Sequence, residues 1–272
     1  MKSAVTVTLV PETRGGPFVF SEGLADAFAR AAALGFDAVE VFPSSAAETD
    51  AAELSALCGK YGLKVAAIGT GAGWVRHRLR LTDPDPAVRR RAIEFVAAVI
   101  DLAAGFGAPA IIGSMQGRFD APVTRPQALG WLREALEELG PRAHARGTFL
   151  LYEFLNRYET NLCVNVAEAV ELVDSLRVPG VRLLCDLFHM NIEEADLAAA
   201  IRLAGPRIGH VHLADSNRQA AGLGHTDFAP VVAALREVGY AGYLSAEVLA
   251  LPDPRRAAEQ TITTFRRLTG RT

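Results

Sequence analysis

Eight short runs of β-branched and aromatic residues alternate along the chain with longer segments rich in alanine, leucine and arginine. The short runs predict strands, and the longer segments repeat their apolar residues with helical spacing. The predicted strands are residues 4–9, 37–42, 63–69, 109–113, 148–154, 181–186, 207–213 and 243–248. The predicted helices are residues 21–34, 51–61, 85–106, 126–146, 166–176, 193–203, 228–238 and 254–268. Because the strands are too uniformly apolar to have a face in water, the pattern predicts a parallel sheet covered on both sides.

The number of repeats favours a closed barrel over an open sheet. A (β/α)8 barrel needs roughly 250 residues, and this chain has 272. No linker, low-complexity tract or shift in composition marks a second domain, and no G-x-G-x-x-G turn follows the first predicted strand. We therefore expect an α/β protein with one TIM-barrel domain over residues 1–272. Ser21 is the expected N-cap of the first helix.

Composition excludes several classes of partner. The formal net charge is −3 and the basic residues are scattered, so no basic stripe favours nucleic acid. The three cysteines, Cys58, Cys163 and Cys185, are too few and too widely spaced for a disulfide framework. No run approaches the roughly 18 apolar residues of a membrane span, and the N-terminal segment lacks the apolar core of a signal peptide. We expect a soluble cytoplasmic protein that binds neither nucleic acid nor membrane.

Four polar residues stand at the ends of consecutive predicted strands, about one β/α unit apart: Glu153, Asp186, His212 and Glu247. In a barrel, the carboxyl ends of the strands meet at one mouth, where catalytic residues lie. Any one of these residues alone could be a helix cap or a solvated loop residue. Together, three carboxylates and one imidazole form an oxygen-rich set that favours Mn²⁺, Mg²⁺ or Co²⁺ over a closed structural zinc site. Without a cation, the three buried carboxylates would repel one another.

Longer segments around these residues carry a family resemblance. The segments YEFLNRYETN (152–161), LLCDLFHMNIEE (183–194), HVHLADSNR (210–218) and LSAEV (244–248) resemble the ketose 3-epimerases of the xylose isomerase-like TIM-barrel superfamily. This group includes D-tagatose 3-epimerase, and the resemblance covers essentially the whole barrel. The segments AIGTGAGWVRHRLRLTDPD (67–85) and GLGHTDF (222–228) look closer to the branch that acts on keto-sugar acids, such as 5-keto-L-gluconate epimerase.

The resemblance implies roles for individual residues. It implies that the four strand-end residues bind a divalent metal ion, with Mn²⁺ first and Mg²⁺ or Co²⁺ as alternatives. It also implies that Glu159, His189 and Arg218 hold the substrate, a small sugar or keto-sugar acid, and that the protein forms a homodimer or homotetramer. No redox cofactor is expected.

The expected reaction inverts C3 of the sugar. The C3 proton is adjacent to a carbonyl, so its removal gives a cis-enediolate whose charge the metal would stabilise as a Lewis acid. Inversion requires the proton to leave one face and return on the other. We expect Glu153 and Glu247 to act as the two acid–base groups, with roles that exchange when the direction reverses.

Other interpretations use the same barrel. Aldose–ketose isomerisation, as in hydroxypyruvate or inosose isomerase, reprotonates the same enediolate at C1. An endonuclease IV-like nuclease would need extra histidines around three zinc ions and a basic DNA groove, and neither is evident. A non-catalytic sugar-binding barrel would be favoured by loss of Glu153 or Glu247, and both are present.

His210 and His212 are two residues apart, so on a strand both point into the barrel. They differ by roughly 6.6 Å in height, so only His212 reaches the level of the carboxylates and His210 is expected about one layer lower. Further candidates are loop residues that could contact the far end of a substrate, although each is more readily explained as an ordinary loop residue: Trp74, Arg76, His77, Gln116 and Arg118.

Overall fold

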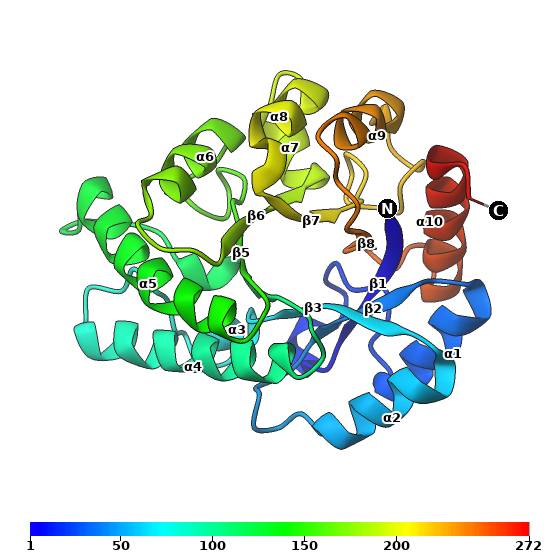
Figure 1. Ribbon diagram of the computed structural model, residues 1–272, viewed down its shortest axis with the longest axis horizontal. Helices are drawn as coiled ribbons and strands as arrows, with labels where there is room; N and C mark the ends of the chain where they lie inside the picture. The colour runs from blue at the N-terminus through cyan, green and yellow to red at the C-terminus, as the bar shows by residue number, and fades with distance from the viewer. Residues whose placement is uncertain (272) are drawn as a thin grey trace.

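A computed structural model describes residues 1–271 of the chain. Its strands form a closed barrel in which each strand pairs in parallel with the next in chain order and β1 pairs with β8 (Figure 1). The strands are β1 (Lys2–Thr8), β2 (Ala38–Phe42), β3 (Lys64–Gly69), β4 (Ala110–Ile112), β5 (Leu150–Glu153), β6 (Val181–Asp186), β7 (Ile208–His212) and β8 (Tyr243–Ala246). The predicted (β/α)8 barrel is confirmed.

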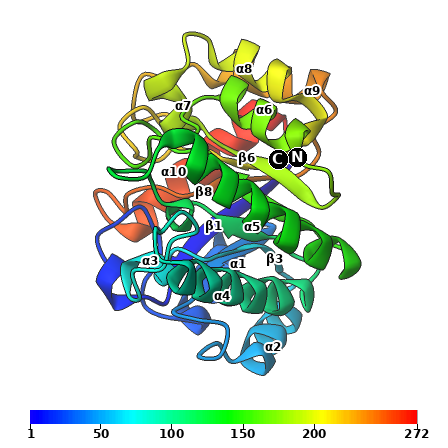
Figure 2. The same cartoon turned by 90° about the vertical axis from the view of Figure 1, so that its left-hand side faces the viewer.

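The helices form a layer outside the barrel, and α4 and α5 lie side by side on one flank (Figure 2). The helices are α1 (Leu24–Leu34), α2 (Ala51–Tyr61), α3 (Ala72–Val75), α4 (Pro86–Ala104), α5 (Arg125–Ala145), α6 (Val166–Ser175), α7 (Leu187–Glu193), α8 (Leu197–Ala204), α9 (Phe228–Glu237) and α10 (Pro254–Thr269). None of the helices within residues 1–271 is long and apolar enough to cross a membrane.

Capping residues set where the helices begin. Asp50 accepts hydrogen bonds from the backbone N–H groups of Ala52 and Glu53 and so begins α2. The predicted cap at Ser21 is wrong, because α1 begins three residues later, with Gly23 in the N-cap position. Gly35 ends α1 at a φ of 79°, a left-handed conformation that glycine adopts without steric cost.

The segment after β6 differs most from the sequence-based prediction. Asp186 caps a short helix, α7, by accepting a hydrogen bond from the N–H of Phe188. Asp196 then caps α8 through the N–H of Ala199, so the predicted helix over 193–203 begins four residues too early. As a result His189 lies within α7 and is carried on a rigid turn directly beyond the barrel mouth.

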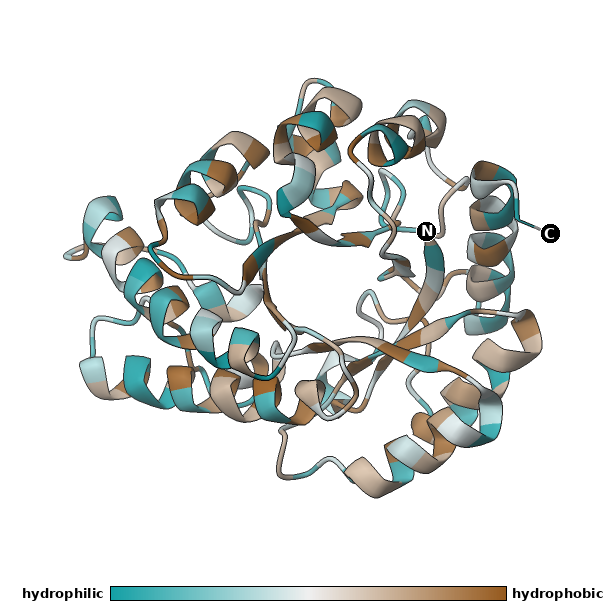
Figure 3. Ribbon diagram, viewed as in Figure 1, coloured by the Kyte–Doolittle hydropathy of each residue, from teal (hydrophilic) through white to brown (hydrophobic). Residues whose placement is uncertain are grey.

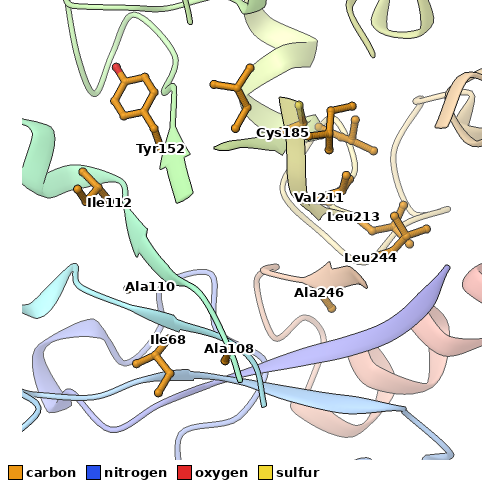
Figure 4. Packing of buried hydrophobic residues seen from close by; sticks show 14 of the residues in the cluster. Ile68, Ala108, Ala110, Ile112, Tyr152, Cys185, Val211, Leu213, Leu244 and Ala246 are labelled. Atoms are coloured by element: carbon orange, nitrogen blue, oxygen red, sulfur yellow. The ribbon is translucent and has the colours of Figure 1, made fainter. Parts of the chain in front are cut away.

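The main core lies between the strands and the helices. The helices turn their apolar faces inward and their polar faces to solvent (Figure 3). Figure 4 shows Tyr152, Cys185 and Val211, all fully buried, packed in this outer core. Cys185 therefore packs toward the helices, as its place one residue before Asp186 predicts. A separate cluster of buried side chains comes from alternate positions of the middle strands: Ala67, Ile111, Leu151 and Leu184.

Candidate active site and metal centre

The four predicted ligands meet at the mouth of the barrel. Each of Glu153, Asp186, His212 and Glu247 offers one ligand atom, and these atoms all lie within 4.8 Å of one another. The Nδ1 atom of His212 is 3.5 Å from Glu153 Oε1, 3.4 Å from Asp186 Oδ2 and 3.4 Å from Glu247 Oε2. Consecutive parallel strands deliver the side chains to the same height, as their spacing in the sequence predicts.

The polar atoms at the centre of this cluster fit a divalent cation. Three buried atoms have no hydrogen-bond partner within the chain: Glu153 Oε1, Asp186 Oδ2 and His212 Nδ1. Buried polar atoms without a partner are rare, and an ion that all of them face is one physical explanation. Carboxylate oxygens with one imidazole nitrogen suit Mn²⁺, Mg²⁺ or Co²⁺.

Arg218 lies against the carboxylates. Its guanidinium forms an ion pair with Glu247 and lies 3.3 Å from Asp186 Oδ2, over the ring of Phe188 at 4.6 Å. Its Nη1 is 3.3 Å from Nε2 of His189. The Nε atom of Arg218 is buried without a hydrogen-bond partner in the chain. The predicted substrate contact is thus also a counter-charge for the cluster.

His189 connects the cluster with Glu159. Its Nδ1 is hydrogen-bonded to the amide of Asn156 at 2.7 Å and lies 3.8 Å from Glu159 Oε1, while its Nε2 is 3.6 Å from Asp186 Oδ2. Asn156 received no role from the sequence, although it belongs to the same NRYETN string. The amide fixes the orientation of the imidazole ring, and the structure places His189, a predicted substrate contact, beside the four-residue cluster.

A cavity of about 320 Å³ opens above the cluster. Glu153, Glu247, Glu159, His189 and Arg218 line it on the side of the later strands. The opposite side is more apolar and includes Val10, Phe18, Phe42 and Val75. A concave pocket with a few converging polar groups on apolar walls is typical of a small-molecule site.

Two glycines at strand ends make room for cavity side chains. A Cβ atom on Gly113 would collide with the carboxylate of Glu153, and one on Gly69 would collide with the ring of Phe42. Both glycines stand at the end of apolar strand runs in the sequence. Only the neighbouring side chains in the fold show why a residue without a side chain is needed there.

The loop residues Trp74, Arg76 and His77 do not line the cavity. Arg76 forms ion pairs with Glu12 and Glu48, both at 3.3 Å. Trp74 lies in α3 beneath Arg78, and His77 packs near Phe95. Their interpretation as ordinary loop residues is the one that the structure supports.

Gln116 and Arg118 have different surroundings in the structure. Gln116 is fully buried, accepts a hydrogen bond from the Tyr152 hydroxyl at 2.8 Å and donates one to the backbone oxygen of Glu153 at 2.9 Å. It therefore supports the end of β5 rather than the substrate. Arg118 is half exposed and lies 3.7 Å from Asp120, outside the cavity.

Sequence reasoning missed Glu40, a fully buried carboxylate on β2. Its Oε2 is 2.7 Å from Nε2 of His210 and its Oε1 is 3.0 Å from Nε2 of His212. His210 thus lies below the four-residue cluster, on the far side of His212, as its position in the strand predicts. A lone acidic residue in the apolar run AVEVF was the signal that could have revealed a buried carboxylate on this strand.

Burial and charge act against each other at the cluster. Burial alone would raise the pKa of Asp186, but Arg218 and His189 outweigh it and hold that pKa well below its usual value. Burial raises the pKa of Glu247, and the nearby Glu153 and Asp186 carboxylates add to the rise. Burial would lower the pKa of His212, but the surrounding carboxylates raise it well above 6.5. The groups therefore differ in proton affinity although they lie within one cluster.

Comparison with known proteins agrees with the barrel fold. The sequence profile of the family "Xylose isomerase-like TIM barrel" matches residues 28–268. The chain is 34% identical to the L-ribulose 3-epimerase of Mesorhizobium japonicum over 78% of this chain and 71% of that one. It is 28% identical to the 3-dehydro-D-guloside 4-epimerase of Escherichia coli over 91% and 95% of the two chains.

A solved structure gives the same result. The D-allulose 3-epimerase of a Methylomonas species, in complex with D-allulose, aligns with a TM-score of 0.82 at 25% identity over 98% of both chains. The chain belongs to the xylose isomerase-like TIM barrel family, in its ketose 3-epimerase group, and is an isomerase that acts on sugars.

Proposed function

We propose that this protein is a metal-dependent epimerase that inverts C3 of a ketose or a keto-sugar acid. The observation that carries the proposal is the convergence of Glu153 and Glu247 on His212 Nδ1, at 3.5 and 3.4 Å, where both glutamates also line the cavity. Two carboxylates that reach one point from different strands are what proton transfer on two faces of a carbon requires.

Glu153, Asp186, His212 and Glu247 would hold the cation. When bound, it would supply Lewis-acid stabilisation of the negative charge that develops on the substrate oxygens. We expect Mn²⁺, with Mg²⁺ or Co²⁺ as alternatives, because hard oxygen ligands dominate the set.

The acid–base steps belong to the two glutamates. One of them accepts the C3 proton, which leaves an enediolate, and the other donates a proton to the opposite face of C3. In the reverse direction the two exchange roles. Glu153 is the last residue of β5 and Glu247 directly follows β8, so the barrel fixes their separation before the substrate arrives.

The substrate contacts come from three residues around the glutamates. Arg218 can donate a forked pair of hydrogen bonds to sugar hydroxyls or to a carboxylate. His189, oriented by Asn156, and Glu159 face the same cavity and can bond to hydroxyl groups. We also expect a homodimer or homotetramer, which sedimentation analysis of the purified protein would test.

A substrate panel in D₂O tests the reaction. Metal-loaded protein is incubated with ketohexoses, ketopentoses, keto-hexonates and a 3-keto-sugar, and the products are examined by NMR. Deuterium at C3 together with the C3 epimer supports the proposal. Deuterium at C1 with formation of an aldose would favour isomerisation, and deuterium at C4 of a 3-keto-sugar would favour 4-epimerisation. Protein treated with a chelator serves as the control, and unchanged turnover there would contradict metal dependence.

A further inference from the structure

We propose that Glu40 is a positioning residue that determines which ring nitrogen of His212 faces the cation. This inference rests on the proposed metal site formed by the four strand-end residues. Glu40 itself contacts neither the cavity nor that cluster of carboxylates, and acts through the imidazole that joins them.

The contact between Glu40 and His212 spans the interior of the barrel. Glu40 lies on β2 and His212 on β7, and β8 and β1 separate the two strands. The Glu40 side chain is fully buried, and its Oε1 is 3.0 Å from Nε2 of His212. The opposite ring nitrogen, Nδ1, is the atom that faces Glu153, Asp186 and Glu247. One imidazole therefore joins the buried carboxylate on β2 to the mouth of the barrel.

The direction of this hydrogen bond selects the tautomer. An ionised carboxylate only accepts hydrogen bonds, so Nε2 of His212 must carry the proton that Glu40 accepts. An imidazole that binds a cation would be neutral, with one N–H and one lone pair, so with Nε2 protonated its lone pair would lie on Nδ1, which faces the cluster. Carboxylates hold metal-binding histidines in this way in many proteins and also raise the basicity of the ligand nitrogen.

His210 fixes the carboxylate in turn. Its Nε2 is 2.7 Å from the second oxygen of Glu40, so both oxygens accept from an imidazole. The rings of His210 and His212 are 5.5 Å apart and nearly perpendicular, at 89°. This arrangement leaves neither Glu40 nor His212 free to rotate without losing a buried hydrogen bond.

A structural role alone explains this arrangement poorly. A buried carboxylate costs several kcal/mol in desolvation. The neighbouring inward-facing positions are apolar or uncharged, such as Leu184, which pairs with His210, and Thr6, which pairs with Glu40. An apolar residue at position 40 would fill the same space at lower cost. A fixed tautomer of His212 is the function that would require a carboxylate at this position.

Two matched substitutions in this buried network separate positioning from folding. Glu40→Gln replaces one acceptor by an N–H donor, so it can force the proton of His212 onto Nδ1. His210→Gln leaves an N–H donor for Glu40 and leaves the bond between Glu40 and His212 intact. We expect Glu40→Gln to raise the dissociation constant for Mn²⁺ about 10- to 100-fold. His210→Gln should change the dissociation constant for Mn²⁺ by less than about threefold. Chelator-competition titrations measure the constant for both variants.

NMR of ¹⁵N-labelled histidines in Zn²⁺-loaded wild-type protein gives a second readout. The expected result is a proton on Nε2 of His212 and a metal-shifted signal for Nδ1. Because this measurement uses the wild-type protein, it tests the inference even where Glu40→Gln fails to fold. A metal-shifted Nε2, or Mn²⁺ affinity of Glu40→Gln equal to that of wild type, would overturn the role of Glu40. Failure of the wild-type protein to bind any divalent cation would instead overturn the proposed function.

Discussion

Gly113 directly follows β4, and its backbone lies beneath the carboxylate of Glu153. A Cβ atom at this glycine would collide with Glu153 Oε2. We expect Gly113→Ala to displace that carboxylate and to lower kcat about 100-fold, because a shift of about 1 Å at a catalytic group has such an effect. Steady-state kinetics of C3 epimerisation at saturating metal would measure it.

Gly130→Ala is the matched control, because a Cβ at Gly130 on α5 meets nothing within 4 Å. It should leave kcat unchanged and raise the free energy of unfolding by about 0.5–1 kcal/mol. A Gly113→Ala protein with wild-type kcat would mean that this backbone does not determine the position of Glu153.

Substitution of the two proposed acid–base groups should separate proton exchange from inversion. Glu153→Gln and Glu247→Gln each keep one carboxylate, so each should still exchange the C3 proton of one epimer with D₂O. Interconversion of the epimers should fall by about 10²- to 10⁴-fold. NMR of deuterium incorporation, with each epimer supplied separately at saturating Mn²⁺, measures both quantities.

Glu94→Gln on the solvent side of α4, where the side chain is 64% exposed, should have no effect and is the control. Equal loss of exchange from both epimers in both variants would count against separate faces for the two glutamates. Full interconversion in either variant would exclude the two-carboxylate mechanism.

The strand pattern predicts most of the barrel and all four residues of the cluster. The predicted strands reach their carboxyl ends at or within two residues of the observed ends, and parallel pairing then places Glu153, Asp186 and His212 at one height. This part is predictable because alternation along a strand and the closed order of strands leave little freedom. The observed helix boundaries depend on local caps. Asp196 caps α8, so the helix predicted over 193–203 begins too early.

The unpredicted features depend on contacts between distant segments. Glu40 and His212 are 172 positions apart, and only closure of the barrel brings them together. The glycine at 113 is explained by the side chain of another strand, and no local pattern contains that information. Arg218 could be assigned to the mouth of the barrel from its loop, but its ion pair with Glu247 follows only from the folded position of that loop.

Removal of the cation should lower the stability of the fold. A cation that binds the native cluster at 100 times its dissociation constant adds about 2.7 kcal/mol to the free energy of unfolding. We expect the Tm of wild-type protein to fall on treatment with a chelator and to return when Mn²⁺ is added. Asp186→Asn, which removes one carboxylate of the cluster, should show a much smaller metal-dependent rise in Tm. The same rise in this variant would place the cation elsewhere.

Asp215 holds the loop that carries Arg218. Its buried carboxylate accepts hydrogen bonds from the N–H groups of Ser216 and Gly222, both at 2.7 Å, and of Thr226 at 3.0 Å. Arg218 itself adopts a left-handed conformation with φ of 57°, which costs energy in a residue other than glycine. Loss of the Asp215 charge should therefore loosen the loop and raise KM.

The stability from Asp215 should depend on pH with a defined sign. Burial alone would raise the pKa of Asp215, but the backbone N–H donors outweigh it and hold the pKa below its usual value. A lowered pKa in the folded state stabilises the protein above the unfolded pKa of about 3.9, and this contribution is lost as the pH falls further. Asp215→Asn should cost about 2 kcal/mol at pH 7.

Urea unfolding of wild type and Asp215→Asn at pH 7, 5 and 3.5 tests this expectation. The difference between the two proteins should be equal at pH 7 and 5 and smaller at pH 3.5. Asp26→Asn, on the surface of α1, should change stability by less than about 0.5 kcal/mol at each pH. A difference from Asp215→Asn that grows as the pH falls would contradict the assigned sign.

We expect Arg14 to be the arginine that distinguishes a keto-sugar acid from a neutral ketose. It lines the cavity, and within residues 1–271 it forms no ion pair. By contrast, Arg218 is paired with the cluster, Arg76 is paired with Glu12 and Glu48, and Arg118 lies beside Asp120 outside the cavity. We expect Arg14→Gln to raise KM for keto-hexonates about fivefold, which corresponds to about 1 kcal/mol at a partly exposed site, and to leave KM for ketoses unchanged.

Kinetics with one keto-hexonate and the matching ketohexose measure this difference in a single variant. Arg118→Gln is the control, because Arg118 lies beside Asp120 and neither residue lines the cavity. It should leave both KM values unchanged. An equal rise for both substrates in Arg14→Gln would assign this arginine to the sugar hydroxyls. No change for either substrate would leave Arg218 as the cation that contacts the far end of the substrate, because Arg218 is the other arginine that lines the cavity.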